Sequence, residues 1–208
     1  MKGLLLKDWY MMRKYCRVYL VICLGFLFLS LMDPENMFFV FYPCLLTGIV
    51  PVNLLAYDER SRWLQYSGTL PYTRTQIVSG KYLIGLLIQA AVLAATGIVQ
   101  SIRMAVNGNF VLNDLLVLIL LMLSVAAITS SITLPFVFRL GVEKGRAAYY
   151  VMVGFVCAAS VLLTKLFKEP LQTEIQPNLL LLLLAAAGVV VYVLSWYLSI
   201  VFYRKREL

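Results

Sequence analysis

Long apolar stretches separated by short polar segments form the main pattern of this chain. A helix needs about 20 residues to cross the hydrocarbon core of a bilayer, and each apolar stretch is of that order. The stretches cover residues 15–32, 37–57, 82–102, 115–138, 147–165 and 179–203. The pattern predicts an all-α membrane protein with six transmembrane helices, which form a single transmembrane domain over residues 1–208.

The composition agrees with a multi-pass membrane protein. Hydrophobic residues make up 62% of the chain and charged residues 13%, whereas soluble domains average about 45–50% and about 25%. Few residues are therefore suited to contact water, and we expect the lipid bilayer to surround most of the chain.

Lysine and arginine are distributed unevenly among the polar segments. Of the 18 basic residues, 15 precede the first stretch or lie at its start (Arg17), follow the sixth, or lie between stretches two and three or four and five. Arg103, Lys165 and Lys168 remain for the other side. Because cytoplasmic loops carry the basic excess, we expect both termini in the cytoplasm. The net charge of +8 is then explained by membrane orientation and anionic lipid headgroups, and no nucleic-acid partner is expected.

Residues 1–17 are predicted to form a helix at the membrane interface. Leu5, Trp9 and Met12 follow one helical stripe, and the basic residues among them reach lipid headgroups, as interfacial helices require. The alternative is a frayed basic tail.

The second stretch contains two prolines, which should kink its helix and free backbone carbonyls for neighbouring helices or a hydrated cavity. Kinked helices often line transport pathways, so candidate pathway residues are Tyr42, Pro43, Pro51, Asn53 and Gln89. Two alternatives remain open, namely that the kinks only improve packing and that Gln89 bonds across helices.

Several kinds of chemistry lack the residues they need. The chain contains no histidine, so the commonest metal ligand and proton relay is missing. No G-x-x-x-x-G-K-[ST] motif is present, so any ATP-driven work must use another subunit. No ionisable residue lies in the middle of an apolar stretch, which disfavours ion-coupled transport. We expect neither an enzyme nor a cofactor or metal bound by this chain.

The polar segment 58–81 has more pattern than a simple connection requires. We expect a short helix that begins at Asp58 or Glu59, which suit the positive end of the helix dipole, and that ends near Gly68. On it Trp63 and Tyr66 are three residues apart and project together. Such a surface suits docking into the groove of a partner, although an interfacial helix lying on lipid is the alternative.

A second helix should follow the break at Leu70-Pro71 and lead into the third stretch. Either Thr73 or Thr75 is placed to cap its first turn.

The segment and the six-span pattern together resemble the type-2 permease subunits of bacterial ATP-binding-cassette exporters. The resemblance extends to the opening of the chain, Met1 to Asp8. The matching residues of the segment are Asp58-Glu59, Leu70-Pro71, Arg74, Ile77-Val78 and Lys81-Tyr82.

The resemblance implies that Glu59 to Tyr66 form a cytoplasmic coupling helix seated in a separate ATPase subunit, which binds ATP and Mg²⁺. It also implies a bacterial plasma-membrane protein, two permease copies as a homodimer, and outward transport. The residues expected to contact the ATPase are Asp58, Glu59, Arg60, Arg62, Trp63, Leu64, Tyr66, Leu70, Pro71 and Arg74.

The function favoured by these features is that of a permease subunit of an exporter. Pathway walls without fixed charge favour an amphipathic or hydrophobic cargo, such as a membrane-active peptide or antimicrobial. The alternative is a non-transporting sensor, immunity or assembly component that binds a soluble protein through the same segment.

Overall fold

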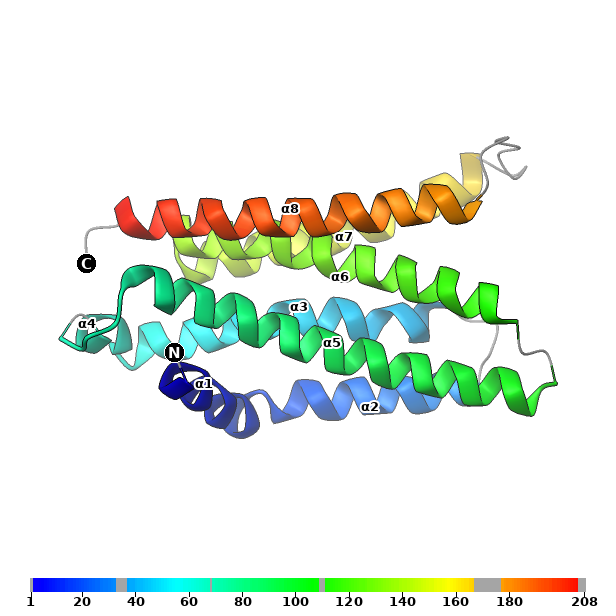
Figure 1. The fold of residues 1–208 in the computed structure, drawn as a ribbon, viewed down its shortest axis with the longest axis horizontal. Coiled ribbons are helices and arrows are strands. Elements are labelled where there is room, and N and C mark those ends of the chain that lie inside the picture. Colours follow the sequence, from blue (N-terminus) through cyan, green and yellow to red (C-terminus); the bar gives the residue numbers. More distant parts are fainter. Residues whose placement is uncertain (1, 33–36, 68, 109–110, 167–176, 206–208) are drawn as a thin grey trace.

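The structure is a computed structural model that describes residues 2–32, 37–67, 69–108, 111–166 and 177–205. The described residues form helices without strands, as the sequence predicts. In chain order the helices are α1 (Lys2–Tyr15), α2 (Arg17–Met32), α3 (Met37–Arg60), α4 (Trp63–Ser67), α5 (Arg74–Val106), α6 (Leu112–Leu140), α7 (Val142–Leu166) and α8 (Pro177–Lys205). The long helices run alongside one another in a bundle (Figure 1).

Four of the described helices, α3, α5, α6 and α8, are long and apolar enough to cross a membrane. Taken as one broken span, the pair α1 and α2, which is bent by 68°, gives a fifth. The first and fifth predicted stretches fall in α2, which has 16 residues, and in α7. A multi-pass helical membrane protein is confirmed, and six spans remain a prediction.

The amino end of α1, the short helix α4 and the carboxyl end of α8 lie at the same end of the bundle (Figure 1). Arg103 lies near the carboxyl end of α5, at the opposite end of the bundle. The side chain of Lys165, and Lys168 itself, are outside the described residues. The arrangement is compatible with the uneven charge distribution, while the side of the membrane that each end faces remains a prediction.

Helix α3 continues through both of its prolines. Pro51 packs closely against α5, since a Cβ added to Gly85 would lie 2.9 Å from the Cγ of Pro51. Nearer the amino end of α3, the hydroxyl of Tyr149 in α7 donates a hydrogen bond of 2.7 Å to the carbonyl of Leu45. The neighbouring helices therefore pack onto α3 and bond to its backbone.

Candidate functional site

The segment between α3 and α5 is the part of the bundle end that the sequence singled out. Asp58 and Glu59 were expected to begin a short helix there, but they form the last turn of α3, and the short helix α4 begins at Trp63. The reason lies at Arg62, whose φ of 53° is left-handed and interrupts the helix. The residue expected to end the helix, Gly68, is outside the described residues.

The start of α5 was predicted correctly. Thr73 is the N-cap: its hydroxyl accepts a hydrogen bond from the backbone N–H of Gln76, while the Gln76 side chain accepts one from the N–H of Thr73. This reciprocal capping box satisfies two backbone donors that a helix start would otherwise leave free. The orientation of the segment that enters α5 is thereby fixed.

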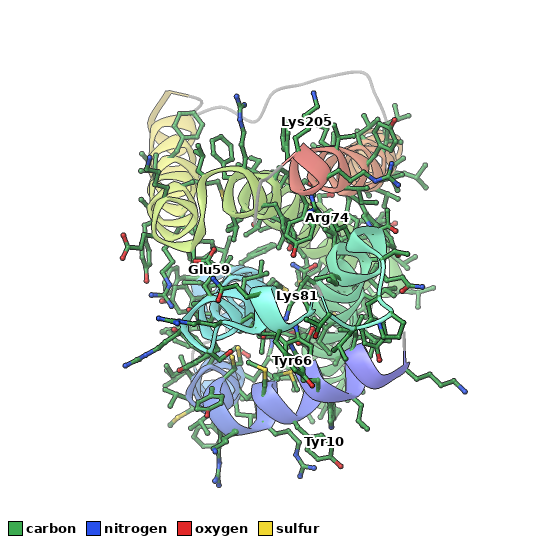
Figure 2. The ribbon with its side chains drawn as sticks, turned by 90° about the vertical axis from the view of Figure 1, so that its left-hand side faces the viewer. Tyr10, Glu59, Tyr66, Arg74, Lys81 and Lys205 are labelled. Carbon is green, nitrogen blue, oxygen red and sulfur yellow. The ribbon has the colours of Figure 1, made fainter. Side chains whose placement is uncertain are left out.

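Several residues proposed for partner binding lie on the surface of this end. The rings of Trp63, half-exposed, and Tyr66, 58% exposed, lie 5.6 Å apart. Figure 2 shows Glu59, Tyr66 and Arg74 at the end of the bundle that faces the viewer. Arg60, Arg62, Pro71 and Arg74 are exposed, Glu59 and Leu70 are half-buried, and the side chain of Leu64 is outside the described residues.

Asp58 is placed differently from the other proposed contact residues, because it is buried in a cluster of four charges. We call this cluster the charge quartet: Lys7 and Asp8 from α1, Asp58 from α3 and Lys81 from α5. The Nζ of Lys81 lies 2.7 Å from a carboxylate oxygen of Asp8 and 2.6 Å from one of Asp58. The Nζ of Lys7 lies 2.7 Å from Asp58 and 3.3 Å from Asp8.

Three members of the quartet are shielded from solvent. Asp8, Asp58 and Lys81 are 2%, 1% and 2% exposed, while the side chain of Lys7 is 21% exposed. An isolated buried charge is strongly disfavoured, but two cations beside two carboxylates compensate one another. The quartet is therefore a neutral polar core at one end of an otherwise apolar bundle.

The quartet also touches α4. The Nζ of Lys7 lies 4.2 Å from the centre of the Trp63 ring, which is a cation–π arrangement. Nearby, the rings of Tyr15 in α1 and Tyr57 in α3 are stacked with their centres 4.3 Å apart. Helix α1 is thus attached to both flanks of the polar segment.

The start of α5 is bonded to α8 on its other side. The hydroxyl of Tyr82 lies within hydrogen-bond distance of the Ser195 and Ser199 hydroxyls, at 2.8 and 2.7 Å. The indole N–H of Trp196 donates to the Ser79 hydroxyl at 3.0 Å. Consecutive residues of α5, Lys81 and Tyr82, therefore hold it to α1 and α3 through charges and to α8 through hydroxyl groups.

Comparison with known proteins decides the class. A family model described as "ABC-2 family transporter protein" matches residues 3–204, almost the whole chain. The chain belongs to the ABC-2 transporter family. Comparisons with curated proteins and with solved structures returned no match.

As an ABC-2 family protein, the chain is a membrane component of an ATP-binding-cassette transporter. Members of this family normally lack ATPase activity of their own, and the family implies an ATP-binding-cassette partner in general. The resemblance found in the sequence is confirmed at this level. The buried charges at the end of the bundle are then part of a permease-type membrane domain.

The pathway candidates of this ABC-2 protein are distributed over several contacts. Pro43 and Pro51 are buried in α3, and the ring centre of Tyr42 lies 4.4 Å from that of Phe26 in α2. The carbonyl oxygen of the Asn53 side chain accepts a hydrogen bond of 2.9 Å from Arg146 in α7. These four residues pack between helices, and a pathway role for them stays a prediction.

Gln89 lies at a cavity on the bundle surface. Its side-chain amide donates to the Ser130 hydroxyl at 2.6 Å and to the Ala126 carbonyl at 3.1 Å, so it bonds across helices as the alternative prediction states. The cavity has a volume of about 280 Å³, and the other four pathway candidates are not among its lining residues. Its lining residues come from three helices and are Leu86, Gln89, Ala90, Leu93, Leu123, Ala126, Ala127, Val189 and Tyr192.

Proposed function

We propose that this chain is the permease subunit of an ATP-binding-cassette exporter, and that a separate ATPase docks on α4. The observation that supports the docking site is the half-exposed to exposed aromatic pair Trp63 and Tyr66, rimmed by Arg60 and Arg62. Aromatic and arginine side chains are the residues most enriched at the energetic centres of protein interfaces. The ATPase subunit binds ATP and Mg²⁺, and α4 serves as the coupling helix.

The proposal includes six spans with both termini in the cytoplasm. Family membership and the basic residues of α1, of the connections on either side of α4 and of α8 support that orientation, because the basic excess marks the cytoplasmic side. Two copies of the chain form a homodimer that encloses the pathway. ATP binding closes the two ATPases, and the coupling helices convert that closure into rigid-body movement of the permeases.

The cargo that fits best is amphipathic or hydrophobic, for example a membrane-active peptide. The cavity at Gln89 supports this choice, because its lining is apolar apart from the Gln89 amide and the Tyr192 hydroxyl. Mostly apolar pockets with few polar groups are typical of sites for such ligands. The direction of transport is outward.

Co-purification with an ATP-binding-cassette subunit tests the docking site. The tagged chain is co-expressed with an ATP-binding-cassette subunit from the same genome and extracted in mild detergent. Tyr66→Ala should lower the amount of ATPase recovered per permease. The matched control is Tyr10→Ala, since Tyr10 is 62% exposed on the outer face of α1 (Figure 2) and should have no effect.

Two outcomes contradict the proposal. Equal losses for Tyr66→Ala and Tyr10→Ala would place the docking surface elsewhere. Recovery of a complex that hydrolyses ATP but moves no amphipathic peptide into inverted vesicles would favour the non-transporting component that binds a soluble partner.

A further inference from the structure

The charge quartet has a closed geometry in which each cation contacts both carboxylates. Lys81 lies at 2.7 and 2.6 Å from Asp8 and Asp58, so its two contacts are equally short. Lys7 lies at 2.7 Å from Asp58 but 3.3 Å from Asp8. Lys81 is therefore held symmetrically, while Lys7 favours one acid and has a second within reach.

This geometry tolerates a small displacement of α1 relative to α3 and α5. Lys7 and Asp8 are neighbours on α1 and move together, so after such a displacement Lys7 stays within reach of Asp8 while Lys81 stays beside Asp58, and no charge is left buried alone. An isolated buried charge would cost several kcal/mol, which is why a single ion pair would resist the same displacement. The quartet is thus a joint that keeps its charges compensated in more than one position.

The partly exposed member of the quartet contacts α4. Lys7 lies against the Trp63 ring, and Trp63 is followed by Tyr66 on the exposed surface of this short helix. A displacement of α4 therefore acts on Lys7 through this contact. Lys7 shares both carboxylates with the deeply buried Lys81 of α5, and the adjacent Tyr82 is bonded to α8.

Stability alone does not account for the quartet. Well-packed hydrophobic side chains of similar volume are often as stabilising as buried ion pairs, or more so, and the best-attested use of buried polar groups is to fix register or to serve a switch. Here the quartet fixes the register of three segments that are far apart in the sequence, because Lys7 and Asp58 are separated by 51 positions and Asp8 and Lys81 by 73.

We propose that the charge quartet is the joint through which movement of α4 is passed to α1 and α5, with Lys81 as the positioning residue on α5. This inference rests on the proposed docking of an ATPase at α4. It adds that α5 moves together with α4 because of the buried charges, and that the covalent connection through residues 69–73 does not by itself transmit this movement.

Hydrogen–deuterium exchange on the purified permease–ATPase complex tests the joint. Exchange is compared without nucleotide and after trapping with ATP and vanadate. In the unmodified complex, trapping should change exchange both in residues 58–67 and in residues 74–90. In the double variant Asp8→Asn/Lys81→Met, which keeps the Lys7–Asp58 pair and a neutral cluster, the change in 58–67 should persist and the change in 74–90 should be lost.

Two control variants separate transmission from general loosening. Asp8→Glu keeps the carboxylate and should keep the response of residues 74–90. Tyr82→Phe loosens α5 from α8 at the neighbouring position without touching the charges, and the response of 74–90 should again remain. A complete response in the Asp8→Asn/Lys81→Met complex would overturn the proposal.

A further variant covers the case in which the double variant does not fold. Lys7→Met/Asp58→Asn removes the cation that contacts Trp63, and it keeps the Lys81–Asp8 pair and a neutral cluster. It should reduce the response of 74–90 while the complex still assembles. An undiminished response would overturn the joint.

The unmodified complex distinguishes this inference from the proposed function. If trapping changes no exchange in residues 58–67, the docking proposal fails and the joint fails with it. If it changes exchange in 58–67 but not in 74–90, docking stands and the joint alone is wrong.

Discussion

Lys81 and Asp8 form an ion pair of 2.7 Å across 73 positions of sequence, at the point where α1 crosses the start of α5. Lys81→Met should destabilise the protein strongly, because it leaves Asp8 and Asp58 buried with one cation between them. Breaking a buried pair on one side costs about 3–5 kcal/mol. Asp8→Asn/Lys81→Met should cost clearly less. Thermal unfolding of the purified chain in detergent compares the two variants, and equal losses would mean that the charges do not act as a unit.

The hydroxyl of Tyr82 provides a second prediction, at the α5–α8 contact. Tyr82→Phe removes its interactions with Ser195 and Ser199 in a buried site and should cost about 1–3 kcal/mol. The loss is smaller for Ser195 than for Ser199, because the Ser195 hydroxyl still donates a hydrogen bond of 2.7 Å to the Ser131 carbonyl in the variant. The control, Tyr10→Phe, changes an exposed ring and should leave the unfolding midpoint unaltered.

Much of this architecture could be predicted from the sequence because it depends on local patterns. The apolar stretches correspond to helices. Thr73 and Gln76, which form the capping box, are only three residues apart in the sequence. The start of α4 could not be predicted in the same way. It depends on a left-handed backbone at Arg62, and an arginine gives no local signal for that conformation.

The quartet was missed because its pairings are tertiary. Asp58 was expected on the partner surface, where an acidic residue beside Arg60 ordinarily lies, but it is buried. Helix α1 buries Leu4, Asp8 and Met12. Because an acidic residue lies in the middle of this stripe, the sequence does not show that this face of the helix is buried. The expected stripe differed: Met12 is buried and Leu5 packs beside it, while Trp9 is exposed. An acid and a lysine, each on the inner face of its helix, are the signal that could have suggested a pair.

Two glycines of α7 make a matched pair for the packing of α6 and α7. A Cβ at Gly145 would lie 3.0 Å from the Cα of Val137 and closer still to its side chain, whereas a Cβ at Gly154 would meet nothing within 4 Å. Gly145→Ala should force α6 and α7 apart at a cost of about 1–3 kcal/mol. Gly154→Ala should cost nothing and favour the helix slightly. Thermal unfolding measures both, and equal midpoints would show that α6 and α7 do not approach so closely.

The orientation of the bundle can be tested with two exposed positions at its opposite ends. Gln65 lies in α4, and Asn107 follows the far end of α5. Cys16, Cys23 and Cys44 are buried, and replacing all four native cysteines by alanine removes background labelling. Because the basic end should face the cytoplasm, a membrane-impermeant maleimide should label Asn107→Cys in intact cells and Gln65→Cys only after permeabilisation. The reverse pattern would put α4 outside the cell, where no ATPase could drive it.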